Sequence, residues 1–245
     1  MNNDHKFKTI SDAFAEDMYR INSDLFYCAF KEYFQNREDF DACLNRLSNE
    51  KEKIIRLGFF YYVVTNEIKH AGVTLISIFS IMEATAENKF QPFDQWLLAR
   101  IKESENISFP IGDKENLKDT ILEHQEKYYA NHGSSEKVRS FIYEYFSEED
   151  KHNLIRGFQI KDSSHDLTSL SFEEQVKAIV DMLYKERNAF VHEGRLPQIT
   201  DQNDRMLGYC KIRNRDTYVS IQISIRQIQK MFEKGFVNFV KKKGA

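Results

Sequence analysis

Helix-breaking residues are scarce in this chain, and that scarcity constrains its fold more than any other feature. Only 9 glycines and 3 prolines occur in 245 residues. Because these two residue types interrupt regular structure, long segments can run as uninterrupted helix. A hydrophobic content of 41% with 20 Phe and 12 Tyr supplies enough apolar surface for a packed core. The composition therefore predicts a folded and mostly helical chain rather than a disordered one.

Apolar residues recur at helical spacing along most of the chain. The pattern predicts helices at about 11–35, 38–47, 71–88, 93–101, 114–130, 135–146 and 148–157. Ser11 is the expected N-cap of the first of these helices. Residues 54–64 are apolar and aromatic, and their pattern fits a helix as well as a strand. The polar segments 104–113 and 161–169 are expected to be loops.

The best-defined helix follows at residues 172–193. Ser171 and Glu174 have the spacing of a capping box, in which each side chain bonds the other residue's backbone. Gly194 supplies a C-terminal stop, and Pro197 prevents the helix from resuming.

The hydrophobic period changes after this helix. Residues 209–213 and 217–223 alternate between polar and apolar, which predicts a β-hairpin. Ser224 with Gln227 then caps a final helix, and the three lysines at 241–243 suit the dipole at its C-terminal end. The sequence thus predicts an all-α fold: a helical bundle with an N-terminal helical extension and one small β-hairpin near the C-terminus.

Targeting signals are not evident. The first residues are polar and do not form a secretory signal. The most apolar run, residues 71–86, is too short and too polar to span a bilayer. Cys28, Cys43 and Cys210 are odd in number and far apart, so they form neither a zinc motif nor a disulfide framework. Free thiols in a reducing cytoplasm are expected, with no membrane association.

Charge is distributed unevenly along the chain. The formal net charge is −3, which argues against a globally basic nucleic-acid binder. Residues 185–245, however, contain thirteen Lys and Arg against six Asp and Glu. This asymmetry can mark a surface for an anionic partner, although basic residues that complement helix ends or face water would produce the same count.

One hexapeptide near the end of the 172–193 helix carries the strongest functional signal. It contains Arg187, Asn188 and His192, and nowhere else in the chain does an Arg precede a His by five residues. A permanent cation, an amide and a titratable imidazole therefore lie within two helical turns. These three groups can act on a phosphodiester without a metal ion.

A helical wheel separates the three residues. The apolar stripe of the helix comprises Phe172, Val176, Ile179, Leu183 and Phe190. Arg187 falls at the edge of that stripe, so its guanidinium must meet a carboxylate, a second subunit or a wet cleft. Asn188 and His192 are four residues apart and share a different face. The three side chains are therefore expected to bracket a groove at the end of the helix.

The pattern Arg187-Asn188-(three residues)-His192 resembles the signature of HEPN domains. These small α-helical domains occur in prokaryotic toxins, abortive-infection proteins, CRISPR effectors and eukaryotic RNA-processing enzymes, and their motif ends a core helix. Many members carry a Glu on an earlier helix, and the segment around Glu83 looks similar. The resemblance covers roughly residues 71–245. It implies a HEPN-like domain there and an N-terminal helical extension over residues 1–70.

The resemblance implies a metal-independent endoribonuclease that acts as a toxin or antiphage effector. The RNA 2′-hydroxyl would attack its own phosphate and leave a 2′,3′-cyclic phosphate and a 5′-hydroxyl. His192 would transfer protons, Arg187 would stabilise charge on the phosphate, and Asn188 would hold His192 or a phosphate oxygen. Two subunits would pair to form one composite cleft. The expected partners are RNA, a second copy of the chain and an antitoxin or defence-system protein.

Two other interpretations stay open. Many HEPN domains have lost catalysis and bind a nucleotide, RNA or a partner protein. Arg187 could also make a buried ion pair, for example with Glu83, in a plain helical scaffold.

One departure from the family is informative. Toxins that an adenylylating partner neutralises carry a Tyr two residues after the motif His, and Gly194 occupies that position here.

The predicted hairpin offers a second set of candidate residues. Lys211, Arg213 and Arg215 alternate along it, share one face and could contact RNA phosphates. The solvated face of a two-stranded ribbon explains the same pattern. The other histidines show no metal-like pairing, and no phosphate-binding loop or zinc-protease motif occurs, so neither a metal nor a cofactor is expected.

Overall fold

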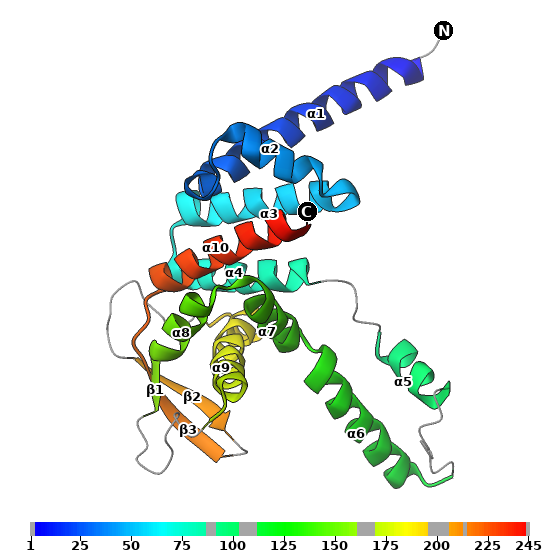
Figure 1. Cartoon of the computed structure of the whole chain (residues 1–245). Helices are drawn as coiled ribbons and strands as arrows, with labels where there is room; N and C mark the ends of the chain where they lie inside the picture. Colours follow the sequence, from blue (N-terminus) through cyan, green and yellow to red (C-terminus); the bar gives the residue numbers. More distant parts are fainter. Residues whose placement is uncertain are drawn as a thin grey trace.

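The computed structural model of the chain is mostly helical (Figure 1), which confirms the predicted all-α class. It describes residues 3–86, 92–102, 112–160, 170–195, 206–212 and 215–243. Within these ranges the side chains of residues 3–14, 101–102, 130–132, 159–160, 206–212 and 215–218 are not described. The predicted loop at 161–169 and most of the one at 104–113 lie outside the described residues.

The N-terminal third of the chain forms α1 (Asn3–Phe30), α2 (Arg37–Asn45), α3 (Lys51–Val63) and α4 (Ala71–Thr85). The prediction that Ser11 caps the first helix is wrong, because α1 already begins at Asn3. No glycine or proline precedes Ser11 to stop the helix. The same helix ends at Phe30 rather than near residue 35, and a short 3₁₀ turn follows it. The undecided segment 54–64 belongs to helix α3 and to the start of a π-helical turn, Val64–Ile68.

The remaining helices are α5 (Phe93–Lys102), α6 (Lys114–His132), α7 (Ser134–Tyr145), α8 (Glu148–Arg156), α9 (Phe172–Glu193) and α10 (Ile225–Lys243). In Figure 1 helices α5 and α6 extend away from the body as an arm. Helix α4 packs against α3, α7, α9 and α10. The helix that carries the motif, α9, therefore packs against the core helix α4.

A small antiparallel sheet completes the fold. Its strands are β1 (Phe158–Ile160), β2 (Met206–Ile212) and β3 (Arg215–Ile221), in the order β1-β3-β2. The hairpin of β2 and β3 confirms that prediction, although both strands begin and end earlier than expected. Strand β1 was not predicted, because three residues are too few to show a period and its partner is distant in sequence. Strand β2 lies against α9.

One continuous hydrophobic core joins the N-terminal helices to α10. Aromatic rings dominate it. The ring centroid of Phe26 lies 5.8 Å from that of Phe236, and Tyr61 lies 5.1 Å from both Phe30 and Phe232. Such contacts fix the first three helices on the C-terminal helix. The division at residue 70 stays a prediction, since a shared core suits both an extension and a single unit.

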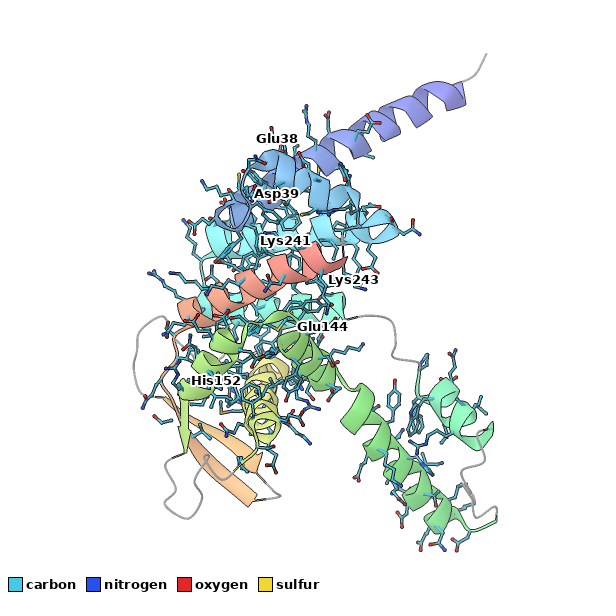
Figure 2. All side chains as sticks on the ribbon, in the orientation of Figure 1. Glu38, Asp39, Glu144, His152, Lys241 and Lys243 are labelled. Carbon is cyan, nitrogen blue, oxygen red and sulfur yellow. The ribbon has the colours of Figure 1, made fainter. Side chains whose placement is uncertain are left out.

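Polar contacts reinforce the same junction. The Glu233 carboxylate on α10 accepts hydrogen bonds from the hydroxyls of Tyr33 and Tyr61, each at 2.7 Å. Burial, with the nearby carboxylate, raises the pKa of Tyr61 well above its usual value, so it stays protonated as a donor. Lys241 lies near the end of α10 (Figure 2). It donates to the backbone carbonyl of Tyr33 at 3.0 Å.

Candidate active site

Helix α9 begins and ends as the sequence predicts. The Oγ of Ser171 accepts from the backbone N–H of Glu174 at 3.2 Å, and the Glu174 carboxylate accepts from the N–H of Ser171 at 2.9 Å. Gly194 adopts a φ of 68°, a left-handed conformation that glycine reaches without steric cost. Pro197 lies outside the described residues. The motif thus occupies the last turns of a helix that is fixed at both ends.

The apolar stripe of α9 faces the core as the helical wheel predicts. Val176, Ile179 and Leu183 are buried. Arg187 follows Leu183 by one turn at the edge of this stripe, and 19% of its side chain is exposed. A carboxylate meets it there, because Glu83 projects from α4 against α9.

The guanidinium of Arg187 has three neighbours. Its Nη2 lies 3.3 Å from Oε2 of Glu83, its Nη1 donates to Oδ1 of Asn188 at 3.1 Å, and its carbon lies 5.3 Å from the ring centroid of Tyr184. The Nε–H group is buried and has no acceptor among the described residues. One N–H donor of this arginine is therefore not used by the residues around it.

Tyr184 completes the cluster, and the sequence analysis missed it. Its hydroxyl donates to Oε1 of Glu83. Burial, and then the hydrogen bond to Glu83, raises the pKa of Tyr184 to about 12, so the hydroxyl remains a donor at neutral pH. The available signal was its spacing, one turn before Asn188 and on the side of Arg187. A partly buried tyrosine that packs against the core is, however, usually only a packing residue.

His192 lies apart from this cluster. It is exposed in the last turn of α9 and makes no hydrogen bond or ion pair with any residue that the structure describes. Val191 beside it is 51% exposed. The structure thus joins Arg187 and Asn188 directly, whereas His192 is presented at the surface next to them.

The arrangement bears on the scaffold interpretation. The ion pair between Arg187 and Glu83 that this interpretation expects is present. Arg187 is nevertheless not enclosed, because about a fifth of its side chain meets solvent and it stands at the exposed end of the helix. Chemically, the surface combines a fixed cation, an amide and a free imidazole.

The candidate residues of the hairpin stay untested. Lys211 lies in β2 and Arg215 begins β3, but their side chains are not described. Arg213 lies outside the described residues. Because β2 packs on α9, the sheet does lie against the helix that carries the motif.

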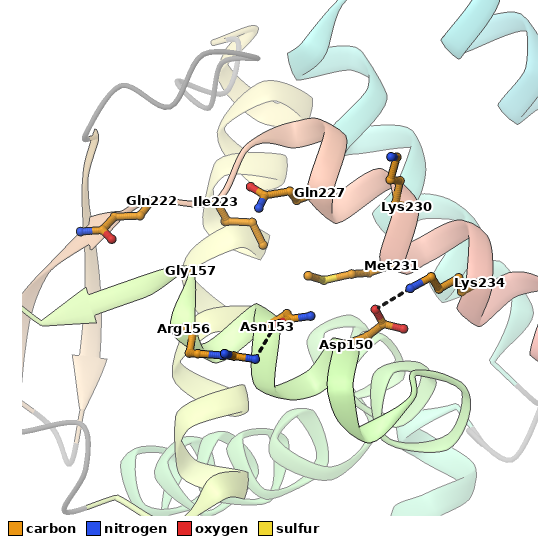
Figure 3. A pocket seen from close by; sticks show the side chains of 10 residues that line it. All are labelled: Asp150, Asn153, Arg156, Gly157, Gln222, Ile223, Gln227, Lys230, Met231 and Lys234. Carbon is orange, nitrogen blue, oxygen red and sulfur yellow. Dashed lines mark hydrogen bonds and ion pairs between the residues drawn. The ribbon is translucent and has the colours of Figure 1, made fainter.

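No group of three or more His, Cys, Asp or Glu side chains in the described part of the chain is arranged to hold a metal ion. No helix in those ranges has both the length and the apolar character of a bilayer span. A pocket between α8 and α10 (Figure 3) is lined by none of the three motif residues.

Comparisons with known proteins do not identify a family. No protein-family model matches the sequence, and neither curated proteins nor solved structures give a significant match. The function must therefore be argued from the motif and its surroundings.

Proposed function

We propose that this chain is a metal-independent endoribonuclease of the HEPN type, with Arg187, Asn188 and His192 as its catalytic residues. The proposal rests on the contacts and the exposure of Arg187. Glu83 and Tyr184 hold its guanidinium in place, yet its Nε–H lacks an acceptor among the described residues and the side chain stays partly exposed. A cation that is held in place and still meets solvent suits an anionic ligand better than it suits a closed ion pair.

The chemistry follows from the three side chains. The imidazole of His192 can take a proton from the 2′-hydroxyl or give one to the leaving 5′-oxygen. Arg187 stabilises the additional negative charge of the phosphorane-like transition state. Asn188 bonds Arg187 at 3.1 Å and thereby limits the rotation of the guanidinium. The attack breaks the bond from phosphorus to the 5′-oxygen and leaves a 2′,3′-cyclic phosphate and a 5′-hydroxyl.

A second copy of the chain would complete the site. His192 and Val191 are exposed on the same short stretch of α9, and the described pocket lies elsewhere. A single subunit therefore presents the motif on a surface. Pairing of two such surfaces would give a cleft with two copies of each catalytic group and would cover the exposed valine. A role as a toxin or antiphage effector, with RNA as substrate, is the function that the family resemblance implies.

The test is RNA cleavage by purified protein in EDTA. Wild type is compared with Arg187→Ala and His192→Ala, and the ends of the products are analysed for cyclic phosphate. Two control variants change the same residue types elsewhere: Arg226→Ala on α10 and His152→Ala on α8, both exposed in the structure. His192→Ala is expected to lose about 100-fold or more of the rate, as is typical for a general acid–base residue. Arg187→Ala is expected to lose about 100-fold or more, as is typical when a group that stabilises charge in the transition state is removed.

The outcomes separate the alternatives. Loss of cleavage in both motif variants, with activity kept in both controls, supports the proposal. If wild type leaves RNA intact but still binds it, the non-catalytic interpretation is correct. Cleavage that persists unchanged in both motif variants contradicts the assignment of the site.

A further inference from the structure

The pocket between α8 and α10 has the size of a small-molecule site (Figure 3). Its volume is about 430 Å³, within the range of roughly 300 to 1,000 Å³ that is common for ligand pockets. Helix α8 forms one wall through Asn153 and Arg156, and helix α10 forms the other through Gln227 and Met231. The segment that joins β3 to α10 lies along its side.

The charges of the residues that line the pocket do not sum to zero. The charged residues are Asp150, Arg156, Lys230 and Lys234. The Asp150 carboxylate is 4% exposed, accepts from the Oγ of Ser147 at 2.7 Å and pairs with Lys234 at 3.2 Å. Arg156 and Lys230 have no carboxylate partner among the residues that the structure describes. Three cations and one carboxylate thus line the pocket, which gives the lining a net positive charge. Arg156 donates to the Oδ1 of Asn153 at 2.6 Å (Figure 3).

Apolar and amide groups make up much of the remainder. Met231 and Ile223 are 6% and 5% exposed and form an apolar surface within the pocket. The Oε1 of Gln227 accepts from Ser224, which leaves its Nε2 hydrogens as donors. A ligand that fits this lining combines negative charge with an uncharged body.

The base of the pocket is rigid. Gly157 follows α8 directly, and its carbonyl accepts the backbone N–H of Gln222 at 2.7 Å. A Cβ at Gly157 would lie 2.6 Å from the Cβ of Ile223, so only glycine permits this close approach. The end of α8 and the segment that leads into α10 are therefore held together before any ligand arrives.

We propose that this pocket binds a small phosphate monoester. A phosphate group carries between one and two negative charges near neutral pH, which matches the two unopposed cations, whereas one carboxylate would match only one. The volume exceeds that of a phosphate several times over, which leaves room for a sugar or nucleoside body on Met231 and Ile223. The site is separate from the motif, and the proposal does not depend on ribonuclease activity.

Isothermal titration calorimetry with the full-length protein tests this site. The probes are AMP, ribose 5-phosphate, inorganic phosphate, uncharged adenosine and a short single-stranded RNA. The variants are Arg156→Ala and Lys230→Ala, with Arg226→Ala as the matched control, because Arg226 is an exposed cation on the same helix that does not line the pocket. All three changes remove a surface charge, and circular dichroism checks that each variant folds.

Binding of AMP or ribose 5-phosphate, weakened roughly tenfold by Arg156→Ala and by Lys230→Ala but less than about twofold by Arg226→Ala, is the expected result. Adenosine should bind far more weakly than AMP. The proposal is overturned if neither monoester binds, or if Arg226→Ala weakens binding as much as the pocket variants do. Binding of RNA alone, lost in the same two pocket variants, would also overturn it and would make the pocket part of an RNA surface.

Discussion

Removal of the Glu83 carboxylate should destabilise the protein through Arg187. The two charged groups lie 3.3 Å apart, and 17% and 19% of their side chains are exposed. At that distance the attraction is roughly 5 kcal/mol for an effective dielectric constant of about 20. Desolvation of both groups and partial exposure offset most of it, so we expect a coupling energy of about 1–2 kcal/mol.

The two single variants should differ. Glu83→Ala leaves the guanidinium with only Asn188 and the Tyr184 ring, whereas Arg187→Ala leaves Glu83 with the hydroxyl of Tyr184. An unpaired cation at a partly buried position is more destabilising than a carboxylate that keeps a hydrogen bond. Glu83→Ala should therefore lower the free energy of unfolding more than Arg187→Ala does.

Urea denaturation followed by circular dichroism measures both effects in a double-mutant cycle of Glu83→Ala and Arg187→Ala. Single-variant losses that add within about 0.3 kcal/mol would refute the coupling. The same proteins are assayed for RNA cleavage. If Glu83 positions a catalytic arginine, Glu83→Gln should lower the cleavage rate while it keeps much of the stability, since the amide oxygen can still accept from Arg187.

Three further predictions concern stability. Gly58→Ala should destabilise the protein by about 2 kcal/mol in urea denaturation, because a Cβ there would lie 2.2 Å from the buried ring of Phe26; an added Phe26→Leu change should recover part of the loss, and a more stable Gly58→Ala would contradict this. Ser171→Ala should cost about 1 kcal/mol through loss of the capping box, with the cleavage chemistry unchanged. Because the pKa of Tyr184 is raised to about 12, the stabilisation from its protonated hydroxyl is complete below the ordinary pKa of 10.0 and is lost as the pH rises through 12. Tyr184→Phe should therefore flatten the fall in stability with pH between those values, and a curve that is unchanged would exclude this cause.

The sequence predicted those parts of the fold that are encoded by a few neighbouring residues. The capping box at Ser171 and the stop at Gly194 are encoded within a few residues, and α9 has the predicted bounds. Strand β1 could not be found in this way, because its pairing of Phe158 with Ile221 depends on contacts distant in sequence. The start of α1 was misplaced for another reason: Ser11 is a good cap by type, but nothing before it ends the helix.

At the candidate site, too, the sequence predicted local positions but not the contacts between side chains. Helical spacing placed Arg187 at the edge of the core stripe and required a partner, and the structure supplies Glu83. Spacing could not show that Asn188 bonds Arg187 rather than His192, because that choice depends on side-chain rotamers. Nor could it identify Tyr184 as the second donor to the Glu83 carboxylate, since a tyrosine that packs against the core needs no further role to explain it.

Part of the basic character of the C-terminal region is used within the fold. Lys241 bonds the carbonyl of Tyr33, and Lys242 pairs with Glu144 of α7. Lys234 and Arg187 also have carboxylate partners. The excess of positive charge in residues 185–245 therefore overstates what an anionic partner meets. Among the described side chains, recognition of phosphate should centre on the end of α9 and on the pocket of α8 and α10. Binding at each of these places involves few phosphate contacts and should depend on salt less steeply than binding to a broad basic face would.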